Sequence, residues 1–191
     1  MDLDTLFSIC LGVGLAAACG FRVFVPLLVT SVAAQTGHLT LAGGFGWIGT
    51  KPALIAFGAA TVLEILAYYV PWIDNLLDLV AGPAAVVAGI VITASVVGDV
   101  DPLMRWSLAV IAGGGAAAAV QTATTVARHV SSWATLGVGN HLLSTGEAVG
   151  SAALAALSVV APFVAALAIA ALGLAVLAVV LRRPWQQRPA S

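Results

Sequence analysis

Charged residues are scarce in this sequence. They make up 8% of the 191 residues, against about 25% in a typical soluble domain. Hydrophobic residues make up 61%, and the mean hydropathy is +1.10. A chain with so few charges cannot cover its surface in water, which excludes an ordinary soluble globular protein. The composition predicts an integral membrane protein built mainly of transmembrane helices.

Residues that hold metals or carry covalent chemistry are also few. The only cysteines, Cys10 and Cys19, lie in the first apolar stretch, where we expect them to be small apolar side chains. No histidines or cysteines stand at metal-ligand spacing, and no nucleophile elbow or phosphate loop occurs. We therefore predict no cofactor and no metal site, and we expect a non-enzymatic function before an enzymatic one. The net charge of −1 argues against a nucleic-acid partner.

Apolar stretches long enough to span a bilayer occur along the whole chain. They cover residues 6–34, 52–70, 76–98, 103–127 and 142–181. The last stretch would be about 60 Å long as one helix, twice the thickness of the hydrocarbon core, so it predicts two spans divided near Pro162. The predicted fold is an all-α polytopic membrane helical bundle of about six transmembrane helices in one domain.

The basic residues near the span ends predict the orientation. Six spans place both termini on one side of the membrane. That side would hold Arg128, Arg182, Arg183 and Arg188, whereas the other side would hold Lys51 and Arg105. The excess of arginine predicts that both termini are cytoplasmic, in a bacterial cytoplasmic (inner) membrane.

A short internal similarity indicates a repeat. The segment Gly14–Cys19 resembles Gly114–Ala119, which begins 100 positions later. Each opens a predicted three-helix half, residues 1–98 and 99–181, and residues 182–191 form a basic cytoplasmic tail. Three spans are an odd number, so the halves would be inverted, as in many transporters. The alternative is that any two alanine- and glycine-rich membrane helices align this well.

Four carboxylates and one arginine are predicted in the cytoplasmic half of the bundle. They are Glu64, Asp74, Asp78, Glu147 and Arg128. A charged group at this depth costs about 2.5–3.5 kcal/mol, so each needs a partner or a function. In one interpretation the carboxylates line a hydrated site that binds an ion or solute. In the other, Arg128 neutralises Glu147 or Glu64, and the two aspartates begin a helix.

Two further positions are candidates for ligand binding. Arg22 lies between Gly20 and Pro26 and is predicted to stand apart from the carboxylates, toward the outer half. A helix break beside an arginine suits an anionic ligand, although a long side chain can also extend to the interface. Asn140 precedes Ser144 and Glu147, which have the spacing of a helix capping box.

Three motifs carry a resemblance to a known family. They begin at Gly14 (Gly-Leu-Ala-Ala-Ala-Cys-Gly-Phe-Arg-Val-Phe-Val-Pro), at Leu63 (Leu-Glu-Ile-Leu-Ala-Tyr-Tyr-Val-Pro-Trp-Ile-Asp-Asn-Leu-Leu-Asp) and at Gly137 (Gly-Val-Gly-Asn). With these motifs the chain resembles small bacterial membrane proteins catalogued as domain of unknown function 4126. The resemblance implies that Glu64, Asp74, Asp78, Asn140 and Glu147 are motif positions. It implies no activity.

The function predicted from these observations is binding or passage of a small solute or ion between two pseudo-symmetric halves, by a transporter or channel. The chain is expected to contact membrane lipid and to form a homo-oligomer. One alternative is a non-catalytic scaffold or assembly partner whose small-residue faces dock other helices. Another is an enzyme that modifies lipid or polyprenyl substrates.

Overall fold

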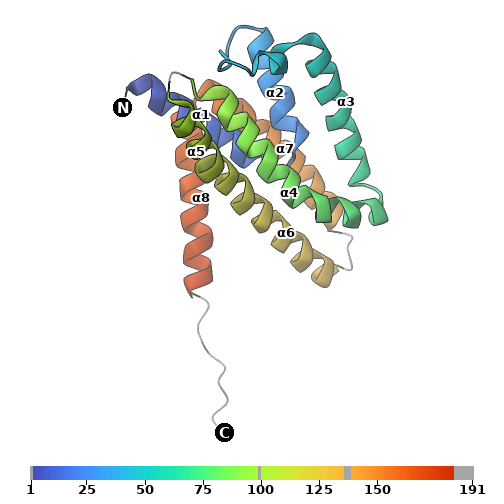
Figure 1. The fold of residues 1–191 in the computed structure, drawn as a ribbon. Helices are drawn as coiled ribbons and strands as arrows, with labels where there is room; N and C mark the ends of the chain where they lie inside the picture. The colour runs from blue at the N-terminus through green and yellow to red at the C-terminus, as the bar shows by residue number, and fades with distance from the viewer. Residues whose placement is uncertain (1, 99, 136–138, 183–191) are drawn as a thin grey trace.

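The computed structural model describes residues 2–98, 100–135 and 139–182, with only the backbone described at 71–78, 134–135, 176–177 and 179–182. The described residues form helices, turns and loops without a strand, so the all-α prediction is confirmed (Figure 1). Within the described residues, three helical segments are long and apolar enough to cross a membrane: Leu79–Val96, Pro102–Trp133 and Asn140–Val160. The predicted count of six spans is not confirmed.

The first apolar stretch forms a helical hairpin. Helix α1 (Leu3–Cys19) and helix α2 (Phe24–Gln35) are separated by a turn at residues 20–23. The start of α1 and the segment after α2 line one cavity, which includes Asp4 and His38, so the two arms open at the same end of the molecule. The break expected near Gly20 and Pro26 is therefore present. However, the chain turns back there and does not continue across as one span.

The remaining helices run the length of the bundle. After a 3₁₀ turn, η1, come α3, α4, a long helix made of α5, the π-helical η2 and α6, and then α7 and α8. Their bounds are Gly46–Gly49 (η1), Lys51–Ala67 (α3), Pro71–Val96 (α4), Pro102–Leu108 (α5), Ala109–Gly114 (η2), Gly115–Thr135 (α6), Asn140–Val160 (α7) and Pro162–Arg182 (α8). The predicted division of the last apolar block near Pro162 is correct.

Two predicted loops are shorter than expected. Residues 71–75, which separate the predicted stretches 52–70 and 76–98, belong to α4, because Pro71 suits a first helical turn, where its missing N–H has no partner to lose. The segment between the predicted stretches 103–127 and 142–181 is also helical as far as Thr135. Val130 and Trp133 in this segment continue the exposed apolar face of α6 that includes Val126.

The arrangement of helix ends differs from the predicted orientation. Phe7 in α1 packs edge-to-face on Phe163 in α8, with ring centroids 6.1 Å apart, so both helices begin at what we call the N-terminal end of the bundle. Helix α8 then runs about 31 Å to the opposite end. The start of α1 and the end of α8 therefore lie at opposite ends (Figure 1), and not on one side. The reason is the hairpin, which returns the chain to its starting end.

Helix α1 forms the centre of the core. Its residues from Leu11 to Cys19 are almost all buried, against α4, α6, α7 and α8. Small residues allow this close packing: a Cβ on Gly20 would lie 2.6 Å from the Ala117 carbonyl oxygen. Buried hydroxyls join the helices, because Thr93 donates to the Gly12 carbonyl and Ser151 donates to the Ala18 carbonyl.

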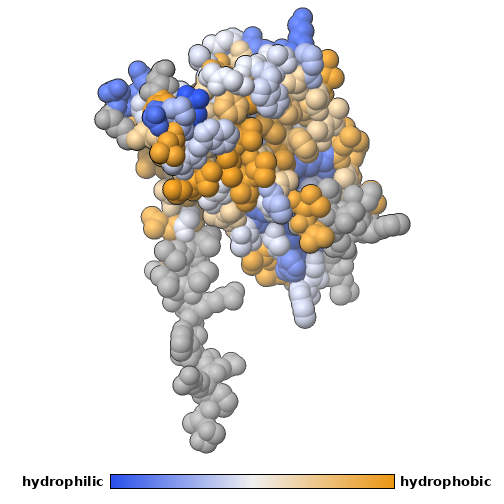
Figure 2. Space-filling view, in the orientation of Figure 1, coloured by the Kyte–Doolittle hydropathy of each residue, from blue (hydrophilic) through white to orange (hydrophobic). Residues whose placement is uncertain are grey.

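The outside of the bundle is largely apolar. Large hydrophobic side chains are exposed on α3, α4, α6, α7 and α8, including Ile55 (71%) and Leu79 (76%). Figure 2 shows hydrophobic residues over the middle of the visible face and hydrophilic residues near the N-terminal end and in patches toward the opposite end. This surface suits contact with lipid tails along the middle of the bundle.

Candidate functional site

The tip of the hairpin carries a buried arginine. Arg22 lies in the turn between α1 and α2 and is 1% exposed. The hairpin reaches far enough for its tip to meet the first turns of α7. There Arg22 Nη2 donates to the Ser144 carbonyl at 2.9 Å and contacts the Ser144 hydroxyl at 2.6 Å.

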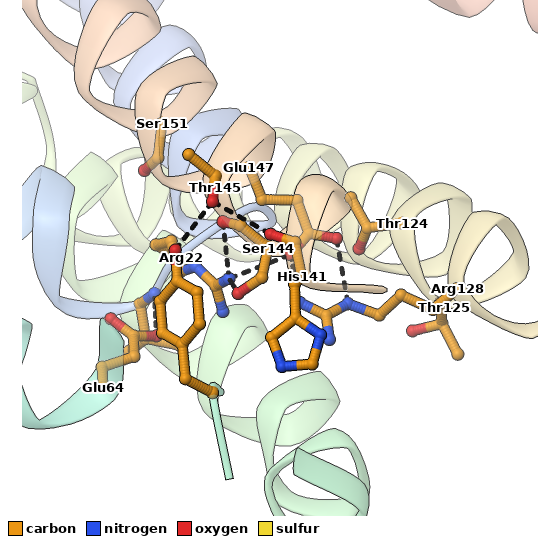
Figure 3. Close-up of polar contacts among 12 residues, drawn as sticks. Arg22, Glu64, Thr124, Thr125, Arg128, His141, Ser144, Thr145, Glu147 and Ser151 are labelled. Carbon is orange, nitrogen blue, oxygen red and sulfur yellow. Dashed lines mark hydrogen bonds and ion pairs between the residues drawn. The ribbon is translucent and has the colours of Figure 1, made fainter. Parts of the chain in front are cut away.

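Two arginines share one carboxylate at this point. Arg22 Nη2 lies 3.2 Å from Glu147 Oε2. Arg128, from α6, donates through Nε to Glu147 Oε1 at 3.0 Å and through Nη2 to Glu147 Oε2. Figure 3 shows the two guanidinium groups approaching Glu147 from different sides. The Arg128 contact is two-pronged, the geometry that holds a buried carboxylate most firmly.

An aromatic ring lies against both guanidinium groups. The Tyr68 ring centroid is 3.7 Å from Arg22 Cζ and 4.4 Å from Arg128 Cζ. A cation over an aromatic face gains about 0.5–2 kcal/mol, with the larger values away from water. Tyr68 follows the last residue of α3 and is 8% exposed, so the end of α3 covers the arginines.

Glu64 has a different role from Glu147. Its two oxygens accept hydrogen bonds from the backbone N–H groups of Val23 and Phe24, at 2.8 Å and 3.1 Å. These groups begin α2, whose N-terminus has no cap of its own. A carboxylate suits the partial positive charge at a helix start. Glu64 therefore holds the turn of the hairpin from α3.

Two donors in the centre of this site lack acceptors. Arg22 Nε and Nη1 are buried and have no hydrogen-bond partner within the described ranges. Glu147 already accepts from both arginines, and Glu64 accepts from the backbone. Arg22 therefore keeps two N–H groups without acceptors among the described residues, close to the second guanidinium group, that of Arg128. N–H groups on paired guanidinium groups are the chemistry that recognises an anion.

The comparison with protein families agrees with the motifs in the sequence. The family model described as domain of unknown function (DUF4126) matches residues 9–183. The chain belongs to this family. No protein of curated function and no solved structure matches it significantly.

The structure brings together some of the predicted site residues of this DUF4126 chain. Arg128 pairs with Glu147, one of the two partners named in the structural interpretation, and Glu64 contacts the hairpin turn at Val23. The prediction that Arg22 stands apart from the carboxylates is wrong, because Arg22 contacts Glu147. The hairpin is the physical reason, since it carries Arg22 to the end where α7 begins.

Other predicted positions lie at the edge of the site or outside the described residues. Asn140 donates to the Ser132 hydroxyl at 2.9 Å, and its Oδ1 is buried without a partner among the described groups. The side chains of Asp74 and Asp78 lie outside the described residues, although their backbone is in the first turns of α4.

The predicted capping box of Ser144 and Glu147 is wrong. Helix α7 begins at Asn140, so both residues lie inside it, and Glu147 pairs with the arginines. The spacing of a capping box is also the spacing of one helix face, and here that face points toward the site. Sequence reasoning missed Ser144 as an arginine partner for this reason.

Tyr68 was also missed by sequence reasoning. Its signal was its position four residues after Glu64, which places both side chains on one face of α3. His141, at the start of α7, is exposed, and its ring lies 5.7 Å from that of Tyr69. Among the described residues, no three histidine, cysteine or acidic side chains gather as a metal site would require.

Proposed function

We propose that this membrane protein binds a small anionic group at the tip of the hairpin and passes it across the membrane. The observation that carries the proposal is the pair of buried nitrogens on Arg22, Nε and Nη1, that lack acceptors in the described part of the chain. A buried donor without a partner costs about 1–3 kcal/mol. A ligand that accepts from both nitrogens removes that cost.

The charges around Arg22 favour an anion. Two guanidinium groups share Glu147, and the Glu64 carboxylate is already held by two backbone N–H groups. A phosphate or carboxylate fits such a pair because guanidinium groups bind it through two parallel hydrogen bonds. A cation would need carboxylate oxygens, and those of Glu147 and Glu64 are already paired, which is why the cation version of the predicted solute site is disfavoured.

A second polar region supports passage and not only binding. At the N-terminal end, a cavity of about 460 Å³ is lined by residues that include Asp4, Ser8, His38 and Arg105. It lies where the hairpin opens, whereas Arg22 lies at the hairpin tip. The two regions face opposite ends of the bundle. In the proposal the cavity is the vestibule on the far side of the membrane from the arginines.

The orientation belongs to the proposal too. Helix α8 ends at Arg182, and the sequence continues with Arg183 and Arg188. This basic cluster favours the cytoplasm for the end that holds Arg22. The hairpin then puts the N-terminal end outside, in contrast to the predicted placement of both termini inside. The inverted repeat and the homo-oligomer stay predictions, and the proposal depends on neither.

In the scaffold alternative, the cluster of Arg22, Arg128 and Glu147 only holds helices together. The contacts of Arg22 and Glu147 join the hairpin to α6 and α7, as a purely structural cluster would. However, several small residues that could dock partner helices are used inside the chain. A Cβ on Gly89, for example, would lie 2.7 Å from the Ala117 Cβ. This internal use weakens the scaffold alternative.

Inorganic phosphate is the probe that tests the proposal. Purified protein is titrated with phosphate against matched ionic strength, with the midpoint of thermal unfolding as the readout, and phosphate efflux is measured from proteoliposomes. Arg22→Gln should weaken phosphate binding at least tenfold and abolish efflux, because it removes both unpartnered nitrogens. Lys51→Gln, which removes an exposed cation at the start of α3, should change neither.

Glu147→Gln separates the two functions further. It removes the carboxylate that competes for both arginines, so anion binding predicts tighter phosphate binding in a less stable protein. The scaffold alternative predicts the loss of stability alone. Equal phosphate binding by the wild type and Arg22→Gln would refute the proposal.

A further inference from the structure

An apolar groove lies on the side of the bundle next to the hairpin tip. It has a volume of about 440 Å³, within the range of small-molecule sites, and lies between α2, α3 and α4. Its walls include Val23 from the hairpin turn, Phe24 from α2, Phe57 from α3, and Val80 and Val87 from α4. Val80 and Val87 are 56% and 60% exposed, so the groove opens to the outside of the bundle.

The groove adjoins the arginine site at Val23. Val23, in its wall, directly follows Arg22, and its backbone N–H is held by Glu64. On α3, Phe57, Thr61, Glu64 and Tyr68 follow one another at helical spacing on one face. This face passes from the groove, at Phe57, to the arginines, at Tyr68.

The face of α3 changes from apolar to polar along this path. Between Phe57 and Glu64 lies Thr61, which is 8% exposed and whose hydroxyl has no hydrogen-bond partner in the described ranges. An apolar wall, then a free hydroxyl, then a cationic pair match in order the hydrocarbon chain, the polar linkage and the anionic head of a lipid. A small soluble anion needs only the last of these.

We infer that the ligand of this site is a lipid with a phosphomonoester head group, which enters from the bilayer between α3 and α4. This inference rests on the proposed anion site at Arg22. The phosphate accepts from Arg22 Nε and Nη1, and the first part of its hydrocarbon chain lies in the groove. The rest of the chain stays in the bilayer, because the groove is open along Val80 and Val87.

Entry of the head group requires a movement at the end of α3. Arg22 is 1% exposed, and the Tyr68 ring lies against its guanidinium group. Helix α3 is held mainly by α2 and has few contacts with α4, and Figure 1 shows it standing apart from α4. A small displacement of the last turn of α3 therefore uncovers Arg22 on the side that faces the groove.

The test compares phosphatidic acid with inorganic phosphate on the full-length protein. Each is titrated in detergent micelles, with phosphatidylcholine of the same chains as the neutral lipid. Val87→Trp fills the groove from an exposed position, and Leu79→Trp adds the same ring to the same helix outside the groove walls. Val87→Trp should weaken phosphatidic acid binding at least tenfold without changing phosphate binding, and Leu79→Trp should change neither. Arg22→Gln should weaken both.

Each other outcome has a defined meaning. If phosphate binds and phosphatidic acid does not, or if Val87→Trp leaves phosphatidic acid binding unchanged, the lipid inference is overturned and the anion site remains. If Arg22→Gln leaves phosphatidic acid binding unchanged, the head group is not at Arg22 and the inference is overturned. If neither probe binds, both the inference and the proposed function fail.

Discussion

Helices α1 and α3 are both 17 residues long and both apolar, but the bundle holds them in different ways. Helix α1 is surrounded by other helices, and glycines let their backbones come close. On α3, only Ala53 and Thr61 are buried, whereas Ile55 and Leu63 are 71% and 67% exposed.

The contacts that hold the far end of α3 are polar. Glu64 binds the start of α2, and the Tyr69 hydroxyl lies 2.7 Å from that of Thr145. Close backbone packing cannot be exchanged for contacts with a ligand, whereas hydrogen bonds and ring contacts can. The comparison indicates that α1 is the fixed element of the site and α3 the movable one.

The largest expected effect comes from adding one methyl group to the fixed element. Gly20→Ala places a Cβ 2.6 Å from the Ala117 carbonyl oxygen, so α1 and α6 must separate. Overpacking of this kind costs about 3 kcal/mol of unfolding free energy. The measurement is unfolding in mixed micelles.

The matched control makes the same change in the movable element. A Cβ on Gly58 would have one neighbour, Leu28 Cδ1, at 3.9 Å. Gly58→Ala should therefore stabilise α3 by about 0.5–1 kcal/mol, because alanine loses less backbone entropy in a helix. Equal destabilisation by both variants would show that α1 and α3 are packed alike.

The sequence was sufficient to predict most of the helices. The proline-marked starts at Pro52 and Pro102, the division at Pro162 and the break after Gly20 all follow from local chemistry. Proline lacks the N–H that a helix interior needs, so its effect does not depend on distant residues. The same local rule cannot say where the chain goes after a break.

The direction of the chain after Gly20 determines which residues meet at the site. An apolar stretch with a break has the same hydropathy whether the chain crosses the membrane or returns. Helix α1 is about 25 Å long, so Arg22, which follows it, lies at the end of the bundle opposite the start of α1. The predicted topology puts the starts of α1 and α7 on one side, whereas in the structure the end of α1 meets the start of α7. Arg22 therefore meets Glu147, although the sequence predicted them apart.

A smaller effect is expected when the polar hold on the hairpin is weakened. In Glu64→Gln, the amide oxygen can still accept from one N–H of Val23 or Phe24, but the amide nitrogen cannot accept from the other. One backbone N–H therefore loses its acceptor, and the favourable negative charge at the start of α2 is removed. Together these losses cost about 2 kcal/mol. Hydrogen exchange at Val23 and Phe24 should become faster, whereas exchange in α1 should not change.

Asp101→Asn is the control for this change. Asp101 caps α5 by accepting from the Leu103 N–H at 2.8 Å, and asparagine caps a helix about as well as aspartate. The same kind of substitution should therefore have almost no effect there. Unchanged exchange at Val23 in Glu64→Gln would mean that the carboxylate does not hold the hairpin turn.

The smallest effect isolates the contact between α3 and α7. Tyr69→Phe removes only the hydroxyl that meets Thr145, at a residue that is 41% exposed, and keeps the ring beside His141. The loss should be about 0.5–1 kcal/mol, the usual net contribution of one hydrogen bond. Thr145→Ala should give a similar loss, and the double variant should lose no more than either alone, because both changes remove the same bond.

If α3 is the movable element, hydrogen exchange in its last turn becomes faster in Tyr69→Phe while α1 keeps its protection. Additive losses in the double variant, or equal changes in both helices, would mean that this bond does not restrain the end of α3 by itself.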